Sequence, residues 1–215
     1  MQEFVVVTGM ILKTEPVGEY DRRVVILTDG RGKISAFAKG ARRQTSRLMA
    51  ATNPFSFGQF KLYEGRNSYS IMEANIQNYF EELRADYIGA YYGMYFLEVA
   101  DYYTRENNDE LMMLKLLYQS LRALLHKKIP NELVKCVYEL KAIAVNGEFP
   151  GAPENGYQDS TVYAIEYIGN ATIEKLYTFM VKEDVLKELQ EISAHYCRRF
   201  MDRKFKSLEI LETLC

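Results

Sequence analysis

Several residue types on which binding sites and scaffolds commonly depend are scarce or missing in this chain of 215 residues. Tryptophan is absent, and the 3 cysteines and 2 histidines lie far apart in the sequence. An odd, unclustered set of cysteines excludes the framework of a small disulfide-stabilised secreted protein and a four-cysteine zinc site. No run approaches the roughly 20 apolar residues that cross a bilayer. The start, Met1-Gln2-Glu3, lacks the features of a secretory signal. We therefore expect a cytoplasmic protein with reduced thiols and no membrane contact.

Sequence motifs of catalysis are missing as well. We find no GxSxG, GxxxxGK[ST], GxGxxG, HExxH or CxxC pattern. His126 and His195 have no recognisable partner in a catalytic triad, and a structural role is the better interpretation of each. The sequence predicts a protein that is not an enzyme.

Acidic residues are missing from one long interval, between Asp29 and Glu64, which contains seven lysines and arginines. The formal net charge of −2 conceals this asymmetry. Residues 1–80 carry 11 basic and 7 acidic side chains, a net charge of +4, whereas residues 81–215 carry 16 basic and 22 acidic side chains, a net charge of −6. A basic field attracts polyanions because each neutralised phosphate releases counterions. The N-terminal part is therefore the candidate nucleic-acid binder.

The first 80 residues have the composition and alternation of strands, with turn residues between them. We expect strands at 4–14, 22–28, 33–38, 57–63 and 69–76. Gly9 predicts a bulge or bend, residues 15–19 and 64–67 predict turns, and a short helix is expected near 46–51. Three strands, a connection and two further strands are typical of a small closed barrel of the OB type. An SH3-like barrel is the alternative, because the number of strands does not separate the two.

After Phe80 the apolar period changes from 2 to 3.6, which indicates helices. The tyrosine-rich segment 87–103 predicts a helix whose apolar face lies in the core, and a base-stacking platform is the less favoured interpretation. Further helices are expected around 114–125, 131–146, 185–200 and 208–211. Residues 147–168 form an irregular insert, in which 160–168 is open between strand and helix. We therefore expect an α+β protein, with an OB-fold domain at 1–80 and an all-helical domain at 81–215.

Three N-terminal blocks resemble the signature of the RecO family of bacterial DNA repair and recombination mediators. They are residues 18–23 (GEYDRR), 27–33 (LTDGRGK) and 38–43 (AKGARR). Residues 147–150 (GEFP) and 206–211 (KSLEIL) are similar to later segments of the same family. The resemblance implies an N-terminal OB fold that binds single- and double-stranded DNA, followed by a helical domain. It also implies annealing of complementary strands and, with RecR and in many bacteria RecF, loading of RecA on single strands coated with the single-stranded DNA-binding protein SSB. SSB itself is expected to contact the helical domain.

One departure from the family pattern concerns zinc. Many family members carry a four-cysteine zinc module after the Gly-x-x-Pro segment, but residues 147–163 contain no cysteine. We therefore expect no zinc and no other cofactor, with packing through Phe149, Tyr157 and Tyr163 holding this segment in place of a metal.

The barrel and the connection after its third strand are expected to follow the phosphates of DNA, because guanidinium groups hold phosphate bidentately. The predicted DNA ligands are Arg22, Arg23, Arg31, Lys33, Lys39, Arg42, Arg43 and Arg47. In the helical part, three basic pairs are weaker candidates for an acidic partner segment: 127–128, 198–199 and 203–204. The resemblance favours a nucleoid-associated recombination mediator. An OB-fold protein that binds RNA, or an adaptor that binds protein, is the alternative.

Overall fold

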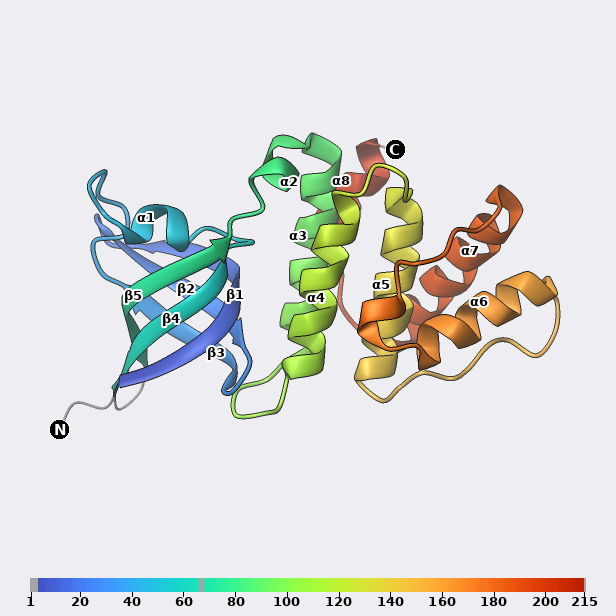
Figure 1. Cartoon of the computed structure of the whole chain (residues 1–215), viewed down its shortest axis with the longest axis horizontal. Helices are drawn as coiled ribbons and strands as arrows, with labels where there is room; N and C mark the ends of the chain where they lie inside the picture. The colour runs from blue at the N-terminus through green and yellow to red at the C-terminus, as the bar shows by residue number, and fades with distance from the viewer. Residues whose placement is uncertain (1–3, 66–67, 215) are drawn as a thin grey trace. The chain divides into compact units, whose positions relative to one another are not determined.

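The computed structural model describes residues 4–65 and 68–214 (Figure 1). Five strands form a closed barrel in the order β1-β2-β3-β5-β4. Their bounds are β1 Phe4–Val17, β2 Asp21–Thr28, β3 Gly32–Ala38, β4 Phe57–Glu64 and β5 Tyr69–Asn78. A short helix, α1 Leu48–Ala51, lies between β3 and β4 and contacts β5. The order confirms the OB fold over the SH3-like alternative.

Strand β1 closes the barrel because it pairs with two neighbours. Its first half pairs with β4 from Phe4 to Met10, and its second half pairs with β2 from Gly9 to Val17. The register of the pairing between β1 and β2 shifts between Ile11 and Lys13. The irregularity predicted at Gly9 therefore lies a little further along the strand. Gly9 is needed for another reason: a Cβ atom there would lie 2.5 Å from the carbonyl oxygen of Leu27. The two strands approach too closely at this point for a side chain.

The strand predicted at residues 33–38 is confirmed as β3. Ile34, Ala36 and Ala38 are buried in the barrel core, while the intervening side chains lie on the outer surface. The turn expected at 15–19 begins later than predicted, because Pro16 and Val17 still pair with β2 and the turn itself comprises residues 18–20. A strand tolerates proline where its nitrogen is not needed for a ladder hydrogen bond. In the turn expected at 64–67, Arg66 and Asn67 lie outside the described residues.

The remainder of the described chain is helical. Its helices are α2 Glu81–Ala85, α3 Tyr87–Tyr103, α4 Leu111–Leu124, α5 Asn131–Val145, α6 Asp159–Asn170, α7 Glu183–Phe200 and α8 Lys206–Leu214, with a 3₁₀ turn, η1, at Ile173–Lys175. The stretch 160–168, open between strand and helix in the sequence, belongs to α6, so only the preceding part of the expected insert is irregular. None of the described helices is long and apolar enough to cross a membrane.

Contacts between residues divide the chain into two compact units. The barrel unit comprises Met1–Glu81 with Leu97–Leu114, and the helical unit comprises Glu82–Phe96 with Lys115–Cys215. The strands and the helices thus separate near residue 80, but α3 and α4 each contribute residues to both units. In the barrel unit, the loop between α3 and α4 contacts the β2–β3 hairpin: the amide of Lys33 donates to the Arg105 carbonyl at 2.9 Å, and the amide of Asn107 donates to the Arg31 carbonyl at 3.0 Å.

Helix α5 is the centre of the helical unit, where it contacts α6 and α7. Ten of its fifteen residues are buried, as expected for a helix covered on several sides. From α3, the ring of Phe96 stacks on Tyr138 with centroids 4.2 Å apart. Tyr92, Tyr95 and Phe96 are buried, so this part of the tyrosine-rich segment belongs to the core.

Candidate nucleic-acid interface

Four of the eight predicted DNA ligands lie on the connection between β3 and α1, residues 39–47, which we call the basic connection. Lys39, Arg42, Arg43 and Arg47 are all exposed. The backbone that carries them is anchored from within, because Ala41 is fully buried in the barrel core and the Gly40 amide donates to the Asp21 carboxylate at 2.7 Å. A buried anchor between exposed cations fixes the loop while its charges point into solvent.

The basic connection is also tied to the β1–β2 turn at residues 18–20. The Arg42 amide donates to the Tyr20 carbonyl at 2.9 Å, and its guanidinium donates to the Gly18 carbonyl at 3.0 Å. The Arg43 guanidinium carbon lies 4.8 Å from the centroid of the Tyr20 ring, within the range of a cation–π contact. The structure therefore brings an aromatic side chain into the basic surface. Sequence reasoning missed Tyr20 as a site residue, although its position inside the GEYDRR block was a usable signal.

Arg22 has a different role from its neighbours. Its Nη1 donates to the Met49 carbonyl at 2.7 Å, to Thr52 Oγ1 at 2.8 Å and to Asn53 Oδ1 at 3.0 Å. Burial lowers the pKa of this guanidinium, and the nearby charge of Arg42 lowers it further. Arg22 thus links α1 and the residues after it to strand β2. Its guanidinium holds the end of the basic connection in place and is less available to a ligand in solvent.

Arg23, the next residue, points out from β2. It is exposed and its Nε donates to Ser35 Oγ on β3 at 2.8 Å. Its pairing partner on β1 is Glu15, which forms an ion pair with Lys13 at 2.6 Å. The hydrogen bond and the charge of Lys13 lower the pKa of Glu15, so this carboxylate is ionised at neutral pH. The field around Arg23 is therefore mixed in sign, unlike that of the basic connection.

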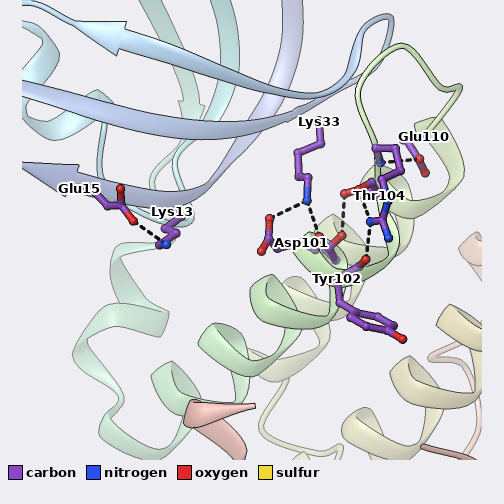
Figure 2. A network of polar contacts seen from close by, with 9 residues as sticks. Lys13, Glu15, Lys33, Asp101, Tyr102, Thr104 and Glu110 are labelled. Atoms are coloured by element: carbon purple, nitrogen blue, oxygen red, sulfur yellow. Dashed lines mark hydrogen bonds and ion pairs between the residues drawn. The ribbon is translucent and has the colours of Figure 1, made fainter. Parts of the chain in front are cut away.

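Arg31 and Lys33, on the β2–β3 hairpin (residues 29–33), are bound to acids of the same unit. The Arg31 guanidinium pairs with Glu64 at 3.3 Å. Figure 2 shows Lys33 pointing at the end of α3, where its Nζ contacts the Asp101 carboxylate at 2.9 Å and the Asp101 carbonyl at 2.5 Å. Gly32 between them has a φ of +64°, and a Cβ there would lie 2.2 Å from the Arg105 carbonyl oxygen. Both cations of the hairpin are thus ion-paired within the barrel unit, and the hairpin packs against the loop between α3 and α4.

A cavity of about 380 Å³ in the helical unit is lined by both basic and apolar side chains. Two of the three basic pairs named from the sequence contribute to it, through Arg198 and through Arg203 with Lys204. Apolar lining comes from Met201, Phe205 and Leu208 among others, with Glu209 and Glu212 also on the lining. Lys127, Lys128 and Arg199 are not among its lining residues. The cavity therefore combines cations with apolar surface, which suits a short segment that is both acidic and apolar.

A buried polar cluster forms one wall of this cavity. Glu139 is 1% exposed, and it accepts hydrogen bonds from Tyr95 at 2.7 Å and from Ser193, and pairs with Lys135 at 2.9 Å. Burial alone would lower the pKa of Lys135, but the charge and hydrogen bond of Glu139 outweigh it and raise that pKa. Burial raises the pKa of the nearby Cys136 thiol to about 12, so the thiol stays protonated at neutral pH.

The residues present do not fit the zinc site of the family. Between 147 and 163 there is neither cysteine nor histidine, and none of the described residues form a metal-binding group of three or more His, Cys, Asp or Glu. Hydrogen bonds hold this segment instead: Tyr196 donates to the Gly151 carbonyl at 2.9 Å, and the Ala152 amide donates to Glu166 at 2.7 Å. The Phe149 ring packs against Gly169, where a Cβ would lie 2.3 Å away. Tyr163, which we expected to help, is 73% exposed and stacks on Tyr167 within α6.

Comparisons with known proteins agree with the barrel and the helices. Residues 1–80 match the family described as "Recombination protein O N terminal", and residues 84–152 match "Recombination protein O C terminal". A protein named "DNA repair protein RecO" from Acetivibrio thermocellus is 26% identical over 96% of each chain. One of the same name from Clostridium perfringens is 26% identical over 95% of this chain and 96% of its own. Another, from Alkaliphilus metalliredigens, is 34% identical over 66% of this chain and 58% of its own.

Proposed function

Because this chain belongs to the RecO family and so has a role in DNA repair and recombination, we propose that its barrel binds single- and double-stranded DNA through the basic connection. Lys39, Arg42, Arg43 and Arg47 make the primary contacts, and Arg23 extends the surface along β2. The observation that carries the proposal is electrostatic. Within the described residues none of the four cations of the basic connection forms an ion pair, whereas Arg31 and Lys33 of the hairpin do.

Annealing of complementary strands follows from this arrangement without a catalytic group. Two strands repel each other through their phosphates, and a shared basic surface removes much of that repulsion. Base pairing then supplies the free energy. We accordingly propose that the protein is not an enzyme and binds no zinc or other cofactor.

The partners are proposed from the family. We propose that the protein works with RecR, and with RecF where it is present, to help load RecA on DNA coated with SSB in the nucleoid. An SSB segment that is acidic and apolar would suit the cavity lined by Arg198, Arg203 and Lys204. The charge of these residues and the apolar side chains of Met201, Phe205 and Leu208 beside them support this assignment.

The test compares salt-titrated binding of single-stranded DNA by wild type and by Arg42→Glu/Arg43→Glu. Reversing both charges should weaken binding by roughly tenfold or more, and should reduce the salt slope by about 1.4, since each phosphate contact on a single strand contributes about 0.7. Lys127→Glu/Lys128→Glu is the matched control, because this exposed pair lies in the helical unit. Annealing of SSB-coated strands should fall with the first variant and not with the second.

An unchanged affinity and salt slope in Arg42→Glu/Arg43→Glu would contradict the proposal and favour the protein-binding adaptor. Tighter binding of RNA than of DNA of equal length and sequence would favour the RNA-binding alternative.

A further inference from the structure

Tyr20 lies in the β1–β2 turn, and its side chain is 44% exposed. The turn that carries it is held by Arg42, which contacts the carbonyls of both Gly18 and Tyr20. A hydrogen bond with Glu19 raises the pKa of the Tyr20 hydroxyl. The exposed ring presents an aromatic surface to solvent.

One guanidinium lies against this ring, and a second cationic residue is bound to the backbone of Tyr20. The Arg43 guanidinium lies over it at 4.8 Å, and Arg42 is its hydrogen-bonded neighbour. The barrel has a second exposed ring under a cation, Phe4, with the Lys61 ammonium 5.4 Å from its centroid. There, however, Lys61 is paired with Glu73 at 3.2 Å. Tyr20 thus differs from Phe4, because among the described residues its neighbours Arg42 and Arg43 form no ion pair with an acidic side chain.

We infer that the Tyr20 ring stacks on an unpaired nucleobase while Arg42 and Arg43 hold the flanking phosphates, so that this surface prefers single strands to duplex. The inference rests on the DNA binding proposed above and specifies how that surface chooses its ligand. A base can stack on an aromatic side chain whatever its sequence, because every base has a π-face. Bases inside a duplex are stacked on their neighbours and do not reach the ring.

Tyr20→Leu, which keeps an apolar side chain but removes the ring, tests the inference against three ligands. They are oligo(dT), an oligonucleotide of the same length with abasic central residues, and a duplex of that length. Affinity for oligo(dT) should fall by about tenfold. Affinity for the abasic strand and for the duplex should stay within about twofold, because their phosphate contacts are unchanged. Tyr20→Phe should retain the wild-type affinity for oligo(dT), and Tyr163→Leu, a change at an exposed tyrosine of the helical unit, should change none of the three.

The chain contains no tryptophan, so the fluorescence of a tryptophan introduced by substitution reports directly on stacking at that position. In Tyr20→Trp the single indole should be quenched by oligo(dT) and not by the abasic strand. In Tyr163→Trp it should be quenched by neither. This readout separates stacking from a structural role of the ring, since a structural role would not distinguish ligands with and without bases.

The outcomes are distinguishable. Equal weakening of all three ligands by Tyr20→Leu, or no weakening of any, would overturn the stacking inference while leaving DNA binding intact. If the wild-type chain binds none of the three, the proposed DNA binding itself fails, and the stacking inference fails with it.

Discussion

The β2–β3 hairpin and the basic connection both carry lysine and arginine and lie close together in the sequence, at residues 29–33 and 39–47, yet these side chains have different surroundings. On the hairpin, Arg31 and Lys33 are bound to Glu64 and Asp101. On the connection, Arg42 and Arg43 are exposed, and their recorded contacts are with backbone carbonyls and a ring. A charge paired within the protein has little left to offer a phosphate, whereas an unpaired one retains its field. Before a basic stretch of sequence is interpreted as a binding site, the cations that form ion pairs within the protein therefore have to be distinguished from those that do not.

The largest expected effect on stability comes from Gly32, because it decides whether the hairpin can pack against the α3–α4 loop. Gly32→Ala places a Cβ 2.2 Å from the Arg105 carbonyl at a φ of +64°, and it should lower the free energy of unfolding by about 3 kcal/mol. Chemical denaturation measures this. Gly30→Ala is the control on the same hairpin, since no atom lies within 4 Å of its added Cβ. Similar destabilisation by both variants would show that the close contact is not what matters.

Arg22→Met should have the second largest effect. It removes three hydrogen bonds from a half-buried guanidinium to the segment after the basic connection, at a cost of about 2 kcal/mol in unfolding free energy. Arg23→Met removes one exposed hydrogen bond and should cost less than about 0.5 kcal/mol. DNA affinity should fall less in Arg22→Met than in Arg42→Glu/Arg43→Glu. The reverse order would place Arg22 among the direct DNA ligands.

The smallest expected effect separates the hairpin from the connection most sharply. Lys33→Met and Asp101→Asn, combined in a double-mutant cycle, should give a coupling free energy of about 1 kcal/mol, because solvent still screens this partly exposed pair. Neither single variant should change affinity for single-stranded DNA by more than about twofold, since the Lys33 charge is committed to Asp101. A tenfold loss of affinity in Lys33→Met alone would return the hairpin to the DNA surface.

Local sequence pattern predicted much of the fold. The strand expected at 33–38 is β3, and the helix expected around 131–146 is α5, Asn131–Val145. Local sequence pattern did not predict features that depend on a contact with a distant part of the chain. Gly9 is required by the approach of Leu27, and the helical state of 160–168 could not be separated from a strand by composition. The expected role of Tyr163 was wrong because α6 turns that ring toward solvent.

The sequence by itself determined the order of strands and helices, the basic character of the first 80 residues and, through the GEYDRR, LTDGRGK and AKGARR blocks, the resemblance to the RecO family. Only the tertiary structure decided which of the described basic residues form ion pairs with acidic side chains. Lys33 is neutralised by Asp101, 68 residues away, and Tyr20 meets Arg43 across two loops of the barrel. Pattern and propensity act between near neighbours in the sequence. Electrostatic pairing depends on distance in space, and folding sets that distance.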